Sequence, residues 1–193
     1  MNSALSVSMT ETHTDELSEQ YLVEEARSDP EAFGLLYQRY MPRVYRYVRA
    51  RTSNDDDAAD LTQQIFARAF RAMPAYESRG VPFVAWLFRV AHNSIANEHR
   101  RDRSTISLDL VPDSAHPVEP SMPEDVALAH EESQEVNRLL SNLDRGKREL
   151  VLLRFAAGLT IREMAAVLGK RESAVRKQLT RTLSHLKEQR RAE

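Results

Sequence analysis

Hydrophobic residues recur every three or four positions in several long segments of this chain, which is the spacing of one face of an α-helix. The first clear segment begins at Asp29 and Pro30, a capping residue followed by a proline at the first helical position, and runs to about Arg51. Its hydrophobic stripe predicts a buried face made of Phe33, Leu36, Tyr37, Tyr40, Val44, Tyr47 and Val48.

Two further helices follow. Residues 54–57 supply an N-cap and acidic side chains before a helix over residues 58–73, and Pro82 begins a longer helix that ends in a basic cluster near Arg101. The loop over residues 75–81 contains an aromatic residue, a cation and a glycine, so it can either hold an unstacked base or serve only as a connection. The predicted core residues are Leu61, Ile65, Phe66, Ala69 and Phe70, and then Phe83, Trp86, Leu87, Val90, Ala91 and Ile95.

Helical periodicity resumes near Pro123 and continues to Leu143. Asp144 can cap the next helix, predicted over residues 145–157, and Gly158 ends that helix. The hydrophobic residues available to a core there are Leu150, Val151, Leu153 and Phe155.

Residues 158–186 then have the pattern of two helices and a tight turn. Thr160 and Glu163 form a capping box, and Gly169 can adopt the left-handed conformation that ends a helix. In the second helix Val175, Leu179, Thr182, Leu183 and Leu186 share one stripe, whereas Ser173, Arg176, Lys177, Thr180, Arg181 and Ser184 occupy the other faces. This pattern predicts a DNA-binding helix-turn-helix, although an ordinary helical hairpin with a solvated basic face would show it too.

Composition excludes several classes of function. The 193 residues include no cysteine, so disulfides, thiolate nucleophiles and Cys-ligated zinc are absent. No apolar run can span a bilayer and the N-terminus is acidic, so we expect a cytoplasmic protein without membrane insertion. His92 and His99 lack a third ligand at metal-binding spacing, and no catalytic constellation or phosphate-binding glycine loop is recognisable. We therefore predict no metal, no cofactor and no enzymatic activity.

Charge divides the chain into blocks. Residues 104–135 carry eight acidic residues and no basic one, whereas residues 145–193 carry thirteen basic and five acidic residues. Such asymmetry is typical of domains that bind polyanions. The sequence predicts an all-α protein of two small helical domains, over residues 19–103 and 123–193, the second a helix-turn-helix. We also predict a disordered leader over residues 1–18. A flexible, acidic, proline-containing linker over residues 104–122 is predicted to join the two domains.

Taken together, the segments resemble the extracytoplasmic function sigma factors, a class of bacterial RNA polymerase specificity subunit, from about Glu19 to Arg190. The first helix of that family resembles the segment AFGLLYQRYMPRVYRYVRAR. Its polymerase-docking helix resembles the segment AADLTQQIFARAFRA. PFVAWLFRVAHNSIANEHRR resembles the helix that melts the promoter and recognises its minus-ten element. LVLLRFAAGLTIREMAAVLGKRESAVRKQLTRTLSHL resembles the minus-thirty-five reader.

The resemblance implies a set of contacts. Docking on the β′ clamp helices of core RNA polymerase would use Asp60, Gln63 and Gln64. Minus-ten DNA would be contacted by Tyr76, Arg79, Asn93, Asn97, Arg100 and Arg101. Minus-thirty-five DNA would be contacted by Arg171, Ser173, Arg176, Lys177, Thr180 and Arg181. The polymerase β flap and an anti-sigma protein are the further partners that the resemblance implies.

Four positions depart from the family pattern. Gln64 and Asn97 stand where acidic residues are usual, and in the turn Lys170 and Arg171 replace an aliphatic residue and a small hydroxyl residue. Two other functions remain compatible with the residues alone. One is a free-standing helix-turn-helix transcriptional regulator, and the other is a helical adaptor whose basic face is only solvated.

Overall fold

The computed structural model describes residues 19–78, 80–105 and 138–192, and all regular structure within these ranges is helical. The all-α prediction is therefore confirmed. The predicted leader, most of the predicted linker and the predicted helix start near Pro123 lie outside the described residues. Short helical stretches cover residues 19–25 and 138–141. The main elements are α2 (Pro30–Arg49), α3 (Asp55–Ala72), η1 (Met73–Ala75), α4 (Phe83–Thr105), α6 (Arg145–Phe155), α7 (Ile161–Leu168) and α8 (Glu172–Ala192).

Side-chain caps fix three helix starts where the sequence predicts them. The carboxylate of Asp29 accepts a hydrogen bond from the Glu31 backbone at 2.9 Å, and Asp144 accepts one from the Lys147 backbone at 2.9 Å. The Asn54 amide oxygen does the same for α3. These caps satisfy backbone N–H groups that have no partner within their helix, so they are local signals that the sequence alone reveals.

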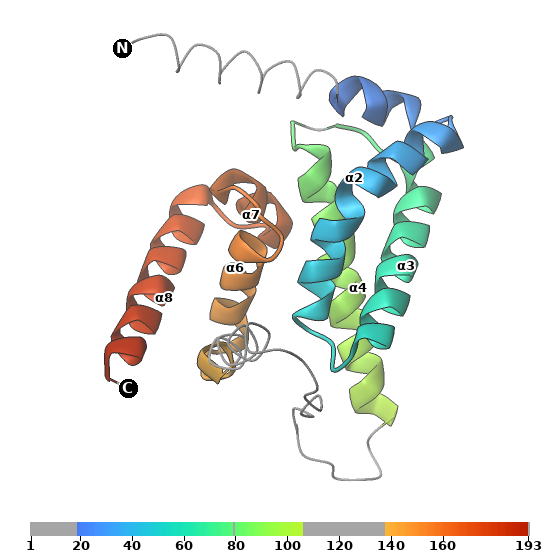
Figure 1. Ribbon diagram of the computed structural model, residues 1–193. Coiled ribbons are helices and arrows are strands. Elements are labelled where there is room, and N and C mark those ends of the chain that lie inside the picture. The colour runs from blue at the N-terminus through green and yellow to red at the C-terminus, as the bar shows by residue number, and fades with distance from the viewer. Residues whose placement is uncertain (1–18, 79, 106–137, 193) are drawn as a thin grey trace, which may run out of the picture.

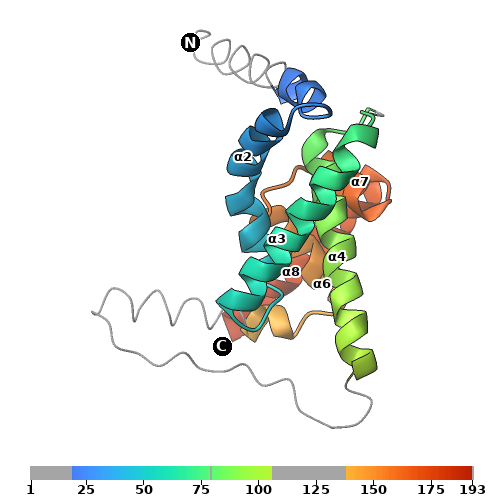
Figure 2. The same cartoon turned by 90° about the vertical axis from the view of Figure 1, so that its right-hand side faces the viewer.

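Helices α2, α3 and α4 form the N-terminal domain around a shared hydrophobic core. Leu36, Val44, Ile65, Leu87 and Phe88 are all almost completely buried in it. Figure 1 shows these helices running side by side, and Figure 2 shows α3 on the side of the bundle away from the C-terminal helices.

The C-terminal domain consists of α6, α7 and α8, and its turn has the predicted geometry. Thr160 and Glu163 form the capping box in both directions, and Gly169 has a φ of 63° at the end of α7. Thr182 is buried within α8 and donates its hydroxyl hydrogen bond to the Gln178 carbonyl at 2.9 Å. The predicted helix-turn-helix is therefore present.

Two predicted core residues are wrong. Phe70 is 44 % exposed because it lies near the end of α3, where its ring makes an edge contact with Phe33 at 5.0 Å between ring centroids. Phe155 is 62 % exposed because it is the last residue of α6, and the chain then turns to bury Ala157 and Leu159 instead.

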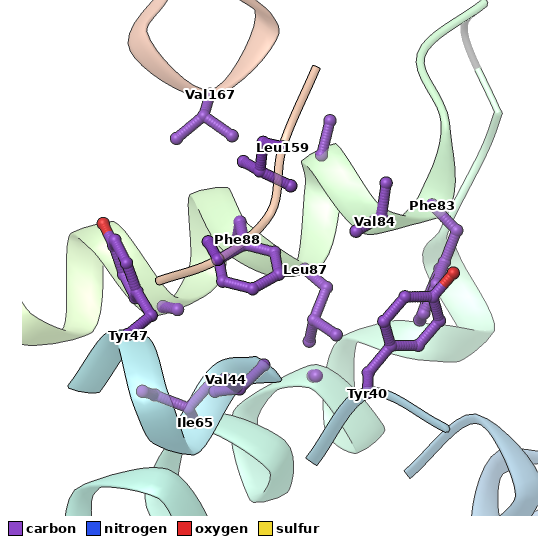
Figure 3. Packing of buried hydrophobic residues seen from close by; sticks show 14 of the residues in the cluster. Tyr40, Val44, Tyr47, Ile65, Phe83, Val84, Leu87, Phe88, Leu159 and Val167 are labelled. Carbon is purple, nitrogen blue, oxygen red and sulfur yellow. The ribbon is translucent and has the colours of Figure 1, made fainter. Parts of the chain in front are cut away.

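The two domains pack against each other and share one continuous hydrophobic core. Helix α7 packs against α4, and α8 lies on the far side of α6 from α2 (Figure 1). In Figure 3, Leu159 and Val167 of the C-terminal domain face Phe88 and Val84 of α4. Leu152 is buried together with Leu150, Val151 and Leu153, although the helical pattern did not single it out.

Candidate nucleic-acid interface

One face of α8 forms an open basic groove. Its lining residues are Ser173, Arg176, Lys177, Thr180 and Arg181. Successive turns of the helix contribute them at intervals of three to four residues, which places them on the same side of the helix. The opposite side of α8 is held in the core by Val175, Leu179 and Thr182. Packing of that buried side therefore points the basic side outward.

The chemistry of this groove suits a DNA duplex. The five lining residues comprise three cations and two hydroxyl side chains, and no carboxylate is among them. Arginine and lysine reach phosphates and guanine edges, and serine and threonine contact phosphates or bases. Five of the six residues predicted for the minus-thirty-five element thus come together. The sixth, Arg171, is exposed just before α8, and its backbone carbonyl accepts a hydrogen bond from the Val175 N–H at 3.1 Å.

A second polar row lies on α4. Asn93, Asn97 and Arg100 are exposed and four and three residues apart, and Arg100 donates a hydrogen bond to the Asn97 side-chain oxygen. Amides and an arginine on one helix face can contact both bases and backbone of a nucleic-acid strand. The side chain of Arg101 and all of Arg79 lie outside the described residues.

Tyr76 is placed differently from the rest of the predicted minus-ten set. It is only 6 % exposed, and its ring packs against Trp86 at 4.9 Å and Phe83 at 5.7 Å between centroids. Burial raises the pKa of its hydroxyl group. In this conformation Tyr76 completes an aromatic cluster at the start of α4, and it would have to leave that cluster to stack on a base.

The three residues predicted for polymerase docking share the outer face of α3. Asp60, Gln63 and Gln64 are all exposed, whereas the neighbouring Leu61 and Ile65 are buried. Since α3 lies on the side of the bundle away from the C-terminal domain, contact between the domains leaves this polar row uncovered (Figure 1).

The sequence did not reveal a polar cluster between the two domains, which we call the Glu149 cluster. Glu149 of α6 accepts hydrogen bonds from the Tyr47 hydroxyl at 2.7 Å and from the Arg51 guanidinium, and its Oε1 lies 3.1 Å from His92 Nδ1. The Arg51 guanidinium lies over the Tyr47 ring, 3.7 Å from its centroid. Only one signal in the sequence points to this cluster, which is that Glu149 is the sole acidic residue of α6.

The cluster is largely shielded from water. The side chains of Arg51 and Glu149 are 9 % and 13 % exposed. Burial alone would raise the pKa of Glu149, but the hydrogen bonds from His92 and Tyr47 and the charge of Arg51 outweigh burial and lower the pKa to about 2. Burial also raises the pKa of Tyr47 well above its ordinary value. Glu149 is thus held as a carboxylate among three donors from the other domain.

Within the described ranges, no group of three or more His, Asp or Glu side chains is arranged to hold a metal ion. His92 instead faces Glu149. The same residues include no helix that is long and apolar enough to cross a membrane.

Two family models match the chain, and each coincides with one of the domains. Sigma-70 region 2 matches residues 36–105, which contain the α3 and α4 rows. Sigma-70, region 4 matches residues 133–186, which contain the basic groove. The residues predicted for polymerase docking and for the minus-ten element therefore fall in one matched region, and those predicted for the minus-thirty-five element fall in the other.

Similar proteins carry sigma factor names. The chain is 34 % identical over 172 residues to the ECF RNA polymerase sigma factor BldN of Streptomyces coelicolor, covering 86 % of this chain and 64 % of BldN. It is 31 % identical over 194 residues to the ECF RNA polymerase sigma factor SigD of Mycobacterium tuberculosis, covering 96 % of this chain and 89 % of SigD. Among solved structures, CnrH in complex with the cytosolic domain of CnrY is similar with a TM-score of 0.69 and 26 % identity, covering 91 % of this chain and 98 % of CnrH.

Proposed function

Since this chain belongs to the ECF RNA polymerase sigma factors, we propose that it binds core RNA polymerase, directs it to specific promoters and helps to open them. One observation carries the proposal: two faces suited to nucleic acid, the α8 groove and the α4 row, lie on separate domains that match regions 2 and 4. A protein that reads two separated promoter elements needs two nucleic-acid-binding faces on separate domains.

In this proposal each surface has its own role. The α8 groove binds the minus-thirty-five duplex, with Arg176, Lys177 and Arg181 contacting phosphates and base edges. The α4 row contacts the minus-ten strand as the duplex opens, and the loop around Tyr76 receives an unstacked base. Taking a base out of the stack costs a few kcal/mol, which contacts with the single strand and the polymerase must offset.

The outer face of α3 is the proposed contact with the β′ clamp helices, and the C-terminal domain the proposed contact with the β flap. Nucleotide chemistry then belongs to the polymerase, so the chain itself has no enzymatic activity and needs no cofactor. It would act in the cytoplasm, where the polymerase and the chromosome are. An anti-sigma protein is the further partner we propose, by analogy with CnrH, whose structure was solved with the cytosolic domain of CnrY.

Transcription from fragmented genomic DNA tests the function. Purified core polymerase is supplied with or without the full chain, and the 5′ ends of the transcripts are sequenced. We expect sharp new start sites that share two upstream elements, and loss of most of these transcripts with Arg176→Ala/Arg181→Ala. Lys187→Ala, which changes an exposed cation of α8 outside the groove, is the matched control and should keep them.

If no new start sites appear while the chain binds duplex DNA tightly without polymerase, the chain is a free-standing regulator instead. Weak DNA binding that does not depend on salt would indicate an adaptor, because phosphate contacts release counterions.

A further inference from the structure

Several polar contacts join the two domains in addition to their shared hydrophobic core. Arg43 donates from Nε to the Ala157 carbonyl at 2.9 Å and from Nη2 to the Gly158 carbonyl at 3.1 Å. Arg89 donates to the Ala166 carbonyl. Together with the Glu149 cluster, these bonds tie α2 and α4 to the C-terminal domain at several separate points.

The docked C-terminal domain also holds the loop before α4. Arg162 of α7 donates from Nη2 to the Gly80 carbonyl at 3.2 Å. Gly80, Val81 and Pro82 line a groove whose other wall comes from α7 and the turn after it. This loop belongs to the segment that we propose receives an unstacked base, so docking restrains a part of the chain that DNA must reach.

Reading both promoter elements requires the domains to move apart, an argument that rests on the proposed function. Elements centred about 10 and 35 nucleotides upstream are about 25 base pairs apart, or roughly 85 Å along B-DNA at 3.4 Å per step. A compact chain of 193 residues has a radius of gyration of about 16 Å and is therefore only about 40 Å across. The docked arrangement is too small to place the α8 groove and the α4 row on both elements.

We propose that the docked arrangement is a closed state of the free protein, and that Glu149 is the latch that must be released before the chain can engage a promoter. Glu149 is the only member of its cluster from the C-terminal domain, and its partners Tyr47, Arg51 and His92 all belong to the N-terminal domain. Separation of the domains therefore breaks every bond of this carboxylate at once.

The latch depends on charge more than on shape. In the closed state Arg51 is nearly buried and its charge is balanced by Glu149, whereas in an open state water solvates both groups. Removing one partner of a buried ion pair leaves the other uncompensated, a penalty that applies only while the domains are docked. Glu149→Gln keeps the size of the side chain and removes its charge, so it should favour the open state specifically.

The closed state also sets the affinity for the polymerase. In the proposed function core polymerase holds the α3 row and the C-terminal domain at two separate sites, so it binds the open state. Its apparent dissociation constant is then raised by the reciprocal of the open fraction. Opening the latch should therefore strengthen binding to core polymerase without any change in the surfaces that touch it. Asp60, Gln63 and Gln64, the proposed docking row, lie on α3 and take no part in the latch.

Fluorescence energy transfer between the domains tests the proposal. The chain has no cysteine, so Gln38→Cys and His185→Cys, both at exposed positions of α2 and α8, can carry a dye pair in the full protein. We expect high transfer in the free protein and low transfer with Glu149→Gln. Glu188→Gln, at an exposed glutamate of α8, is the matched control and should leave transfer high.

A second variant shows whether lower energy transfer reflects separation of the domains and not local unfolding of α6. Arg51→Met disturbs the same ion pair from the N-terminal domain, so it should lower energy transfer while the helical circular dichroism signal stays constant. Unchanged transfer in both folded variants would overturn the proposal. The half-saturating concentration for core polymerase should fall at least about fivefold with Glu149→Gln, and an unchanged value alongside low transfer would overturn the inhibitory role.

A different result would contradict the proposed function. If neither the original chain nor Glu149→Gln gives new start sites with core polymerase, the sigma factor assignment of this chain is wrong. The energy transfer measurement involves neither polymerase nor DNA, so it still decides whether Glu149 closes the molecule.

Discussion

At the scale of single residues, Glu149 illustrates how a buried charge can favour one arrangement of two domains. Its carboxylate has left water, which is costly, but three donors from the opposite domain replace the lost hydration. Because its pKa is lowered to about 2 only while the donors are present, protonation and domain closure are linked.

This linkage predicts a pH dependence for closure. The pKa of Glu149 is depressed in the closed state, from its ordinary value of 4.5 to about 2, so its contribution is complete above pH 4.5 and is lost as the pH falls towards 2. The shift corresponds to roughly 3 kcal/mol. We expect the difference in closure free energy between the original chain and Glu149→Gln, measured by energy transfer, to shrink over this pH range. A difference that stays constant down to pH 2 would contradict the prediction.

At the scale of elements, local signals specified the helix starts and the turn. Asp29, Asn54 and Thr160 cap helices where the sequence predicts because each side chain bonds to a backbone group within three residues of itself. Gly169 takes the left-handed conformation for a similarly local reason. Such features depend on a few neighbouring residues, so one sequence is enough to find them.

The turn makes a specific stability prediction. No atom lies within 4 Å of a Cβ added at Gly169 and its φ is +63°, so Gly169→Ala changes only backbone strain and should destabilise the protein by about 1 kcal/mol. Gly34→Ala is the matched control, because its Cβ also meets nothing but the residue lies inside α2, where alanine stabilises a helix by about 1 kcal/mol. Urea unfolding measures both. Equal effects of the two substitutions would contradict this account of Gly169.

The groove on α8 makes a prediction about DNA. Arg176→Ala should weaken binding of the polymerase holoenzyme to promoter DNA and, if Arg176 contacts a phosphate, reduce the slope of log affinity against log salt by about 1. Binding measured by fluorescence anisotropy at several salt concentrations gives the slope. Lys187→Ala should leave it unchanged, and an equal loss with both variants would show that only overall charge matters.

Helical periodicity predicted less well which hydrophobic residues are buried. It placed Phe70 and Phe155 in the core, but both lie near helix ends where the chain leaves them partly uncovered, and it passed over Leu152. Burial at such positions depends on segments far away in the sequence. The site divides in the same way: the α3, α4 and α8 rows follow from spacing within one helix, whereas burial of Tyr76 and the Glu149 cluster depends on tertiary packing.

At the scale of the whole molecule, the shared core means that the two domains stabilise each other. Val84 and Phe88 of α4 belong to the same buried cluster as Leu159 and Val167 (Figure 3). Neither domain keeps its full buried surface when the other moves away. The stability of each domain is therefore coupled to closure.

Calorimetry can detect this coupling. We expect the full chain to unfold in one cooperative transition at neutral pH, because the domains share one core. Arg43→Gln, which removes the bonds to Ala157 and Gly158, should separate this transition into two or lower its midpoint. Arg145→Gln, an exposed cation at the start of α6, is the control. Two independent transitions in the original chain would contradict the coupling.

Among the residues that the structure describes, most of the hydrogen bonds between the domains end on backbone carbonyls. Arg43, Arg89 and Arg162 donate to the carbonyls of Ala157, Gly158, Ala166 and Gly80, which no side-chain substitution at those positions can remove. Because every residue has a backbone carbonyl, substitution of the accepting residue leaves the acceptor in place, so natural selection has little influence on these bonds at the accepting positions. Correlated evolution between the two domains should therefore be concentrated at the Glu149 cluster, where both partners are side chains.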